Sequence, residues 1–269
     1  MDRRAVGVFD SGLGGLTAVR EIRRILPGEN IVYFGDTARV PYGSRSPETL
    51  LRYARQDMRF LGGFDLKAIV VACGTVSTTC LSTLQAESGI PLIGVCEPSC
   101  RRAAAVSRGR VGLIATAASI RSGAYERTLA AIRPDVRVFG KACPLFVPLV
   151  ENGRVRRGDP VIETVAREYL SALKAERIDT LILGCTHYPL LTEIIGAEMG
   201  EGVLLINSGA EAAEALKTLL VEKDALSDAE TGDARFFASD RVENFASLAE
   251  FFLAEHLQHE AEQIDIEQF

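Results

Sequence analysis

The sequence predicts an α/β protein made of two similar α/β domains with mostly parallel sheets, which face each other across an active-site cleft. Three observations predict this class. Short apolar runs alternate with segments whose apolar residues recur every three to four positions, which is typical of βαβ units. Turn residues interrupt this pattern near 96–99 and near 207–209. Two of the apolar runs, one on each side of the first interruption, end in a cysteine followed by a small or hydroxyl residue.

Four apolar runs in the first 95 residues predict buried strands, and two amphipathic segments between them predict helices. The expected strands cover residues 5–9, 31–34, 67–72 and 91–95. Such short apolar runs, bounded by polar or turn residues, are typical of strands that are covered on both faces. The expected helices cover residues 16–26 and 47–61, where apolar residues recur at helical spacing.

The same alternation continues through the rest of the chain. Expected strands cover residues 111–115, 136–139, 180–183 and 203–206, and expected helices cover residues 162–175 and 210–221. Because helical segments separate most of the strands, we expect mostly parallel sheets. Residues 255–269 are polar and acidic, so we expect a solvated helix end there.

Composition limits the classes of function. A chain of 269 residues with 47% hydrophobic content can bury a sizeable core as one large domain or two smaller ones. Its net charge of −6 argues against a nucleic-acid surface and favours a small polar substrate. No apolar stretch approaches the ~20 residues that span a bilayer, and the first four residues lead into a predicted strand rather than a signal peptide. We therefore expect no membrane association, and a cytoplasmic location in which the cysteines stay reduced.

A glycine-rich segment at 12–15 follows a predicted strand and precedes a predicted helix. It does not match a dinucleotide fingerprint, because Thr17 stands where the third glycine belongs. We expect instead a tight turn whose amide groups can hold an anion. The sequence also contains no Walker lysine pattern, no serine nucleophile elbow and no lysine in a context typical of a pyridoxal Schiff base. No cofactor is expected.

Three pairs of sulfur or imidazole ligands raise the question of a metal. They are Cys185 with His187, Cys96 with Cys100, and His256 with His259. None belongs to a complete zinc ligand set with two properly spaced halves, so no metal site is expected. Four cysteines are expected to be small buried hydrophobic residues, namely Cys80, Cys96, Cys100 and Cys143.

The other two cysteines, Cys73 and Cys185, end two of the predicted strands. Open α/β sheets place their ligands at the carboxyl ends of their strands. Two thiols on opposite walls of one cleft could remove a proton from one face of a carbon and return a proton to the other face. That is the chemistry of a cofactor-independent racemase. A single strand-end cysteine is more often a packing residue, so the hypothesis depends on the pair.

Six motifs follow one another along nearly the whole chain. They are residues 7–17 (GVFDSGLGGLT), 34–43 (FGDTARVPYG), 72–75 (ACGT), 148–153 (PLVENG), 183–191 (LGCTHYPLL) and 236–240 (FFASD). In this order they resemble the motifs of the bacterial glutamate racemase family. The resemblance implies two α/β domains with the active site between them. Residues 1–95 and 206–269 would form the first domain, and residues 96–205 would form the second.

The resemblance also implies roles for individual residues. Those implied to take part in catalysis are Cys73, Cys185, Asp10, His187 and Glu151. Those implied to contact substrate are Asp10, Ser11, Pro41, Tyr42, Gly43, Gly74, Thr75, Ser119 and Thr186. Ser119 stands where the family usually has threonine, and Gly74 stands where it usually has asparagine. A side-chain amide contact is therefore missing at residue 74, and we expect a backbone N–H or a water molecule to replace it.

Stabilisation of the carbanion is the main chemical demand of such a reaction. An amino-acid Cα–H is a far weaker acid than a thiol of pKa about 8.5, so thiolate basicity alone cannot drive its removal. We expect backbone amides near Ser11 and Thr75, with the hydroxyls of Thr75 and Thr186, to hydrogen-bond the α-carboxylate as it gains enediolate character. Closure of the domains would exclude water and strengthen these contacts.

The neighbours of the two thiols differ in charge. Asp10 is suited to the substrate ammonium and should disfavour the Cys73 thiolate, whereas a cationic His187 should favour the Cys185 thiolate. The resemblance implies that Cys73 acts on the D enantiomer and Cys185 on the L enantiomer. Each of these residues also has a purely structural interpretation. Asp10 alone could be a helix N-cap, Tyr42 with Gly43 could form an ordinary turn, and His187 could be a hydrogen-bonded buried residue.

The function implied by the resemblance is interconversion of L- and D-glutamate without a cofactor, which supplies D-glutamate for peptidoglycan synthesis in bacteria. Two alternatives stay open. One is an aspartate racemase with the same paired cysteines, and the other is a catalytically silent amino-acid-binding sensor. The expected partner is glutamate, with a homodimer as an open alternative. The sequence contains no visible determinant for a regulatory protein contact, such as one with DNA gyrase.

Overall fold

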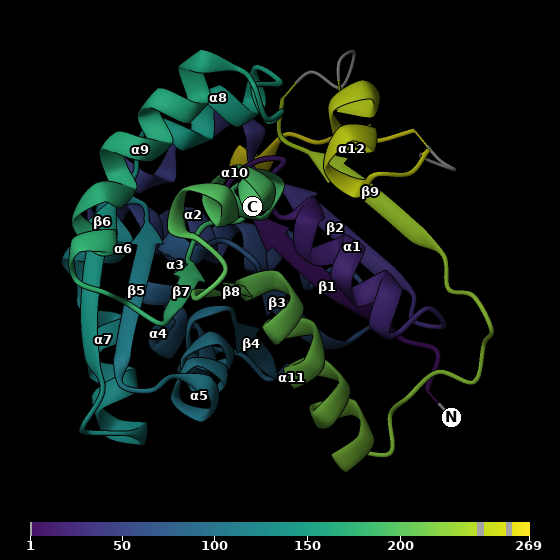
Figure 1. Cartoon of the computed structure of the whole chain (residues 1–269). Coiled ribbons are helices and arrows are strands. Elements are labelled where there is room, and N and C mark those ends of the chain that lie inside the picture. The colour runs from purple at the N-terminus through teal and green to yellow at the C-terminus, as the bar shows by residue number, and fades with distance from the viewer. Residues whose placement is uncertain (1, 241–244, 257–259) are drawn as a thin grey trace.

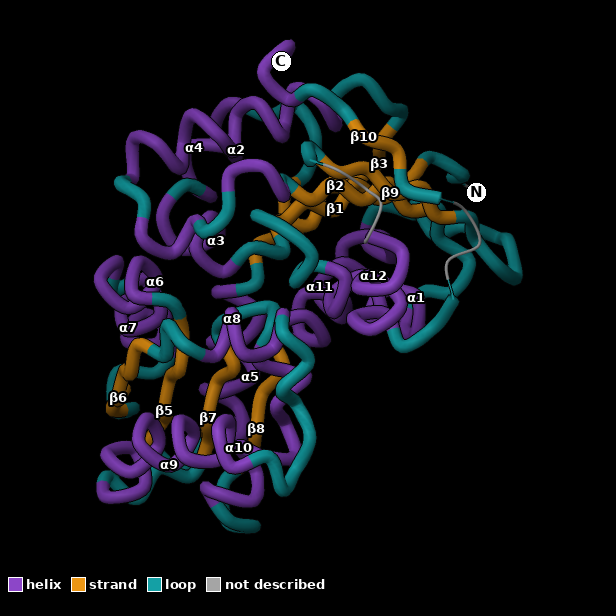
Figure 2. The backbone as a smooth tube through the Cα atoms, turned by 90° about the horizontal axis from the view of Figure 1, so that it is seen from above, coloured by secondary structure: helices purple, strands orange, loops and turns teal. Residues whose placement is uncertain are grey.

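The chain folds around two separate parallel sheets (Figure 1 and Figure 2). A computed structural model describes residues 2–240, 245–256 and 260–269. The six-stranded sheet has the order β10 (Glu262–Gln263), β9 (Ala234–Ala238), β2 (Ile31–Gly35), β1 (Ala5–Asp10), β3 (Leu66–Val71) and β4 (Leu92–Gly94). The four-stranded sheet has the order β6 (Arg137–Ala142), β5 (Arg110–Ala115), β7 (Thr180–Leu183) and β8 (Leu204–Asn207). All pairings between these strands are parallel, so the predicted fold class is confirmed.

Helices cover both sheets. The α-helices are α1 (Leu16–Ile25), α2 (Pro47–Leu61), α3 (Gly74–Thr79), α4 (Leu81–Glu87), α5 (Cys96–Val106), α6 (Ala117–Ser122), α7 (Ala124–Ile132), α8 (Phe146–Glu151), α9 (Pro160–Ala175), α10 (Thr192–Met199), α11 (Ser208–Glu222) and α12 (Phe245–Leu253). Short 3₁₀ helices are η1 (Thr37–Arg39), η2 (Tyr42–Ser44), η3 (Tyr188–Leu191) and η4 (Ile266–Gln268). In the part of the chain that the structure describes, no helix combines the length and the apolarity needed to cross a bilayer.

Local sequence explains where the longer helices begin. Ser46 caps α2 by accepting a hydrogen bond from the Thr49 amide, and Pro47 fills the first helical position, where a missing N–H has no cost. Asp159 caps α9 in the same way, again with proline next. The Asn207 side chain accepts hydrogen bonds from two amides at the start of α11. Each cap satisfies backbone donors that a helix leaves unpaired.

All eight predicted strands and all four predicted helices are present, with ends that differ by at most three residues. The solvated helix end predicted for residues 255–269 is wrong for the residues that the structure describes there. That segment forms β10, which pairs with β9, and then η4, in which the Ile266 side chain is only 3% exposed. Ile266 packs in the cluster that contains Phe34 and Phe60, so its burial overrides the polar composition of its neighbours. Residues 257–259 of the predicted segment lie outside the described residues.

The strands of the two sheets come from different parts of the chain. Residues 5–94 and 234–263 supply the six-stranded sheet, and residues 110–207 supply the four-stranded sheet. Figure 2 shows the sheets in separate halves with helices between them. The predicted boundary at residue 206 lies inside β8, and the division into two domains at residues 95 and 206 stays a prediction. One hydrophobic cluster includes side chains from both sheets, so the two halves pack against each other.

Candidate active site

Three strand ends deliver the central side chains of the site. Asp10 is the last residue of β1, Cys73 follows β3 and directly precedes α3, and Cys185 follows β7. All three side chains are buried. The prediction that each thiol lies at the carboxyl end of a buried strand is therefore confirmed, and the two thiols come from different sheets.

Cys73 lies in surroundings that favour its neutral thiol. Its Sγ is 3.6 Å from the Ser11 hydroxyl oxygen, to which it donates. Burial, and then the negative charge of Asp10, raise the pKa of Cys73 well above its usual value, and a negative charge on Cys185 would raise it further. Near neutral pH this thiol keeps its proton and can act as a donor.

Asp10 uses its two oxygens differently. Its Oδ2 accepts hydrogen bonds from the amides of Gly12 (3.3 Å) and Gly15 (2.9 Å), so the glycine-rich turn holds this carboxylate rather than an external anion. Its Oδ1 is buried and has no hydrogen-bond partner among the described residues. Burial raises the pKa of Asp10, while His187 and the turn amides act against that rise. The capping role and the site role thus coexist in one side chain, which retains one free acceptor.

Cys185, His187 and Glu151 form a chain of polar contacts. The Cys185 Sγ lies 3.8 Å from His187 Nδ1, and His187 Nε2 lies 3.0 Å from a carboxylate oxygen of Glu151. Burial acts to lower the pKa of His187, but its contacts with Cys185 and Glu151 outweigh this and raise that pKa to about 10. The ring is therefore an imidazolium at neutral pH, and its positive charge lies beside the Cys185 sulfur. The Glu151 side chain is 42% exposed, so this series of polar contacts reaches the protein surface.

Two further residues contact the Cys185–His187 turn, and neither was predicted from the sequence to lie at the site. Phe252 on α12 contacts the His187 ring edge-on, with ring centroids 5.4 Å apart. The Thr17 hydroxyl donates to the Thr186 carbonyl oxygen (2.8 Å), which links α1 to the turn that bears Cys185. The first contact packs against the imidazole itself, and the second holds the backbone of the residue before it.

A cluster of hydroxyl groups joins the two halves of the chain. The Thr75 and Thr116 hydroxyl oxygens are 2.9 Å apart, and Thr116 also contacts the Ser119 hydroxyl at 3.1 Å. The Ser119 hydroxyl accepts from Thr78 at 3.3 Å and is fully buried. Thr116 was not among the predicted site residues, although a threonine directly after a buried strand was a usable signal. The cluster brings Thr75 of α3 against the start of α6.

The turns that carry the two thiols touch each other. A Cβ atom at Gly74 would lie 2.5 Å from the Gly184 carbonyl oxygen and 3.9 Å from Cys185 Cα. A Cβ atom at Gly14 would lie 2.3 Å from the Thr186 hydroxyl oxygen. The cavity bordered by Gly74, Gly184 and Cys185 measures about 10 Å³, which is room for one water molecule at most. In this arrangement an asparagine side chain has no room at residue 74, because the Gly184 carbonyl occupies that space.

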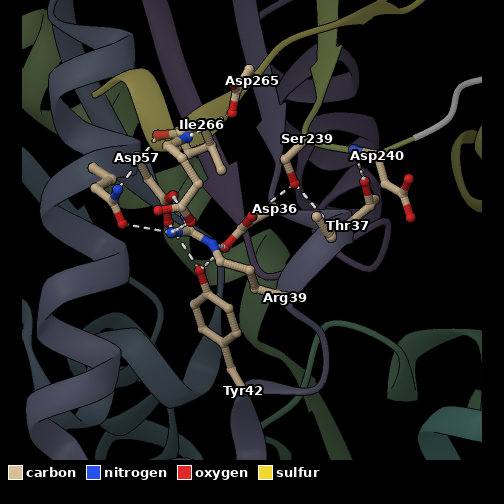
Figure 3. Close-up of polar contacts among 12 residues, drawn as sticks. Asp36, Thr37, Arg39, Tyr42, Asp57, Ser239, Asp240, Asp265 and Ile266 are labelled. Carbon is tan, nitrogen blue, oxygen red and sulfur yellow. Dashed lines mark hydrogen bonds and ion pairs between the residues drawn. The ribbon is translucent and has the colours of Figure 1, made fainter.

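The predicted contacts in the segment 41–43 have different orientations. The Tyr42 hydroxyl points towards Asp36, to which it donates, as Figure 3 shows. Only the backbone of Tyr42 can therefore face the site. Gly43 lies close to Thr116, since a Cβ atom there would be 3.0 Å from Thr116 Cβ, and Pro41 is exposed.

The pairs considered as metal ligands have other surroundings. Cys96 and Cys100 are buried within α5, and the His256 ring contacts Glu250 at 2.9 Å, while His259 lies outside the described residues. Within the described ranges, no group of three or more His, Cys, Asp or Glu side chains is arranged to hold a metal ion. Cys185 and His187 supply two potential ligands, fewer than a zinc site needs.

The chain is similar in sequence and in structure to known proteins. Residues 14–216 match the family model described as Asp/Glu/Hydantoin racemase. The chain is 48% identical over 255 residues to a glutamate racemase of Geobacter metallireducens, which covers 94% of each chain. It is similar in structure to the glutamate racemase isoform RacE1 of Bacillus anthracis, with a TM-score of 0.93, 40% identity and coverage of 98% and 99% of the two chains. A Francisella tularensis glutamate racemase solved in complex with D-glutamate gives a TM-score of 0.92 at 38% identity over both full chains.

Proposed function

This chain belongs to the Asp/Glu/Hydantoin racemase family, and we propose that it interconverts L- and D-glutamate with Cys73 and Cys185 as the two acid–base groups. The observation that carries the proposal is the pair of strand-end thiols with neighbours of opposite charge. Asp10 disfavours ionisation of Cys73, whereas the His187 imidazolium lies 3.8 Å from the Cys185 sulfur. In this proposal Cys73 is the proton donor and Cys185 is the base, as a two-base racemisation requires.

The proposed reaction uses these two roles. The Cys185 thiolate removes the Cα proton of L-glutamate, and the electron pair of the broken C–H bond delocalises into the α-carboxylate. The Cys73 thiol then delivers its proton to the opposite face of Cα, which gives D-glutamate. The enzyme is left with a Cys185 thiol and a Cys73 thiolate, and the reverse reaction starts from that state.

Several polar groups would support the substrate during this step. The unpartnered Oδ1 of Asp10 can accept a hydrogen bond from the substrate ammonium group. The hydroxyls of Thr75 and Thr186, with Ser11 and the Gly43 backbone, can hydrogen-bond the α-carboxylate as negative charge accumulates there. Because the Gly74 and Gly184 turns touch, we propose that substrate enters after the two halves separate and that they close over it.

D-glutamate made in this way would be used in peptidoglycan synthesis, and we place the reaction in the cytoplasm, where thiols stay reduced. The chemistry assigned to the two thiols requires no cofactor.

The function is tested by following the circular dichroism of L-glutamate after mixing with protein that has been dialysed against a chelator, with L-aspartate in a parallel assay. We expect the glutamate signal to decay to zero, and Cys73→Ala and Cys185→Ala to lower kcat at least ~10²-fold. Cys80→Ala is the matched control, because this buried thiol lies at the far end of α3, and it should keep its activity. A stable glutamate signal would contradict the proposal, as would faster decay with aspartate.

A further inference from the structure

A buried polar cluster surrounds the hydroxyl group of Tyr42. It contains two carboxylates, Asp36 and Asp57, with the Arg39 guanidinium and the Gln56 amide. All of these side chains are less than 10% exposed, and none of them was among the predicted site residues. Burial of charged groups costs free energy unless they are paired and fully hydrogen-bonded, so such a cluster requires a structural or functional reason.

Arg39 is at the centre of this cluster. Its Nε contacts Asp36 at 2.6 Å, one Nη contacts Gln56 at 2.5 Å, and the other Nη contacts Asp57 at 3.1 Å. Figure 3 shows that the Tyr42 hydroxyl points into the same group, where it donates to Asp36 and lies 3.4 Å from Asp57. The rigid guanidinium fork therefore holds three acceptors, and one of them holds Tyr42.

Two distant segments of the chain anchor the cluster. The Ser239 hydroxyl, after β9, donates to Asp36 (2.7 Å) and accepts from the Ala38 amide (2.9 Å). In η4, a Glu267 carboxylate oxygen is 3.4 Å from Arg39, and the Ile266 carbonyl oxygen accepts from Gln56 at 3.5 Å. Ser239 and η4 thus anchor the cluster whose Asp36 carboxylate accepts from Tyr42.

On its other side, the same turn meets the candidate active site. η2 packs against α6, and Gly43 lies so close to Thr116 that a Cβ atom there would be 3.0 Å from Thr116 Cβ. Thr116 in turn contacts the hydroxyls of Thr75 and Ser119. A shift of the Tyr42 side chain by a few tenths of an ångström would therefore be passed to Gly43 and to these hydroxyls.

We propose that Asp36, Arg39 and Asp57 are positioning residues for racemisation, which hold Tyr42 so that the Gly43 backbone stays aligned with the hydroxyl cluster that binds substrate. The proposal rests on the proposed function, because it treats that cluster as part of the glutamate site. The cluster acts on the substrate only through Tyr42 and Gly43. Its loss should therefore weaken substrate binding more than it slows proton transfer at the two thiols.

Two conservative variants test the proposal. Tyr42→Phe removes only the hydroxyl, and Arg39→Lys keeps the charge but loses the fork that holds Asp36, Gln56 and Asp57. We expect each to raise KM for both enantiomers of glutamate about 3- to 10-fold, the effect of one lost hydrogen bond, with kcat within about twofold of wild type. Each variant is assayed well below its own Tm.

The matched control is Glu29→Gln, which removes the charge from a different buried ion pair. Glu29 lies 2.5 Å from Lys67 at the opposite end of the same sheet, and both side chains are at most 2% exposed. This variant should lower Tm and leave KM unchanged. If Tyr42→Phe and Arg39→Lys lower Tm and also leave KM unchanged, the cluster is merely structural and the positioning role is refuted. A wild-type protein that fails to racemise glutamate would refute the proposed function itself, and the positioning role with it.

Discussion

Gly74→Ala places one methyl group at the point where the two thiol-bearing turns touch. The new Cβ would lie 2.5 Å from the Gly184 carbonyl oxygen, whereas real Cβ contacts almost never fall below 3.0 Å. Because backbone rather than a flexible side chain blocks the methyl group, the Gly184 carbonyl must retreat by at least about 0.5 Å. Cys185 follows Gly184 directly, so its thiol moves too.

The size of the effect can be worked out from that displacement. A misplacement of about 1 Å in a catalytic site costs about 10²-fold, so half of that distance predicts a loss of about tenfold in kcat. Overpacking costs about 1–3 kcal/mol of stability, and replacing a helical glycine by alanine returns up to about 1 kcal/mol. The net loss of about 0–3 kcal/mol corresponds to a Tm lower by at most about 12 °C for a chain of this size.

The assay compares Gly74→Ala with Gly89→Ala, which has no heavy atom within 4 Å of its added Cβ. We expect Gly89→Ala to match wild type in kcat and Tm, as measured by circular dichroism for each enantiomer and by calorimetry. A Gly74→Ala variant with kcat within twofold of wild type and with the same Tm as Gly89→Ala would contradict this prediction. The two turns would then not touch during turnover.

Replacement of His187 by Asn should lower kcat/KM about 10²- to 10⁴-fold, the effect of a positioned acid or base, and equally in both directions because the free enantiomers are equal in energy. Wild-type kinetics with an unchanged pH profile would contradict a catalytic role for His187. The pKa of His187 in the folded protein is raised from 6.5 to about 10. The imidazolium therefore stabilises the folded state fully below pH 6.5, and this stabilisation is lost as the pH rises towards 10. The Tm difference between wild type and His187→Asn should therefore shrink over that range in calorimetry, and a constant difference would contradict the shifted pKa. Glu151→Gln removes one contact that raises the pKa of His187, so the alkaline limb of the pH profile of kcat/KM should move to lower pH; an unmoved limb would show that Glu151 does not act on His187.

The fold was largely predictable because most of its elements have a clear local pattern. The strands at 67–72 and 180–183 are short apolar runs, and the four predicted helices have apolar residues at helical spacing. β9 was missed because Arg235 interrupts a short run whose extended conformation depends on pairing with β2, about 200 residues earlier. β10 consists of two residues that are a strand only because β9 lies beside them.

The site was predictable only in part, for the same physical reason. The positions of Cys73 and Cys185 follow from where their strands end, which is local information. The contact between Gly74 and Gly184 joins residues that are far apart in the sequence, as does the Thr75–Thr116 hydroxyl pair. Such contacts arise from the packing of one half of the chain on the other. The orientation of Tyr42 was likewise set by Asp36 and Asp57 behind it rather than by its own neighbours in the motif.

The proposed mechanism places one thiol on each face of the α-carbon. We would test it by racemising L-glutamate in D₂O and measuring deuterium at Cα separately in substrate and product during the first few per cent of conversion. Because Cys185 would remove the proton and Cys73 would deliver a solvent-derived deuteron, we expect D-glutamate that carries deuterium while the recovered L-glutamate keeps its proton. Deuterium that enters the recovered L-glutamate as fast as D-glutamate forms would contradict it, because a single group would then be exchanging protons on both faces.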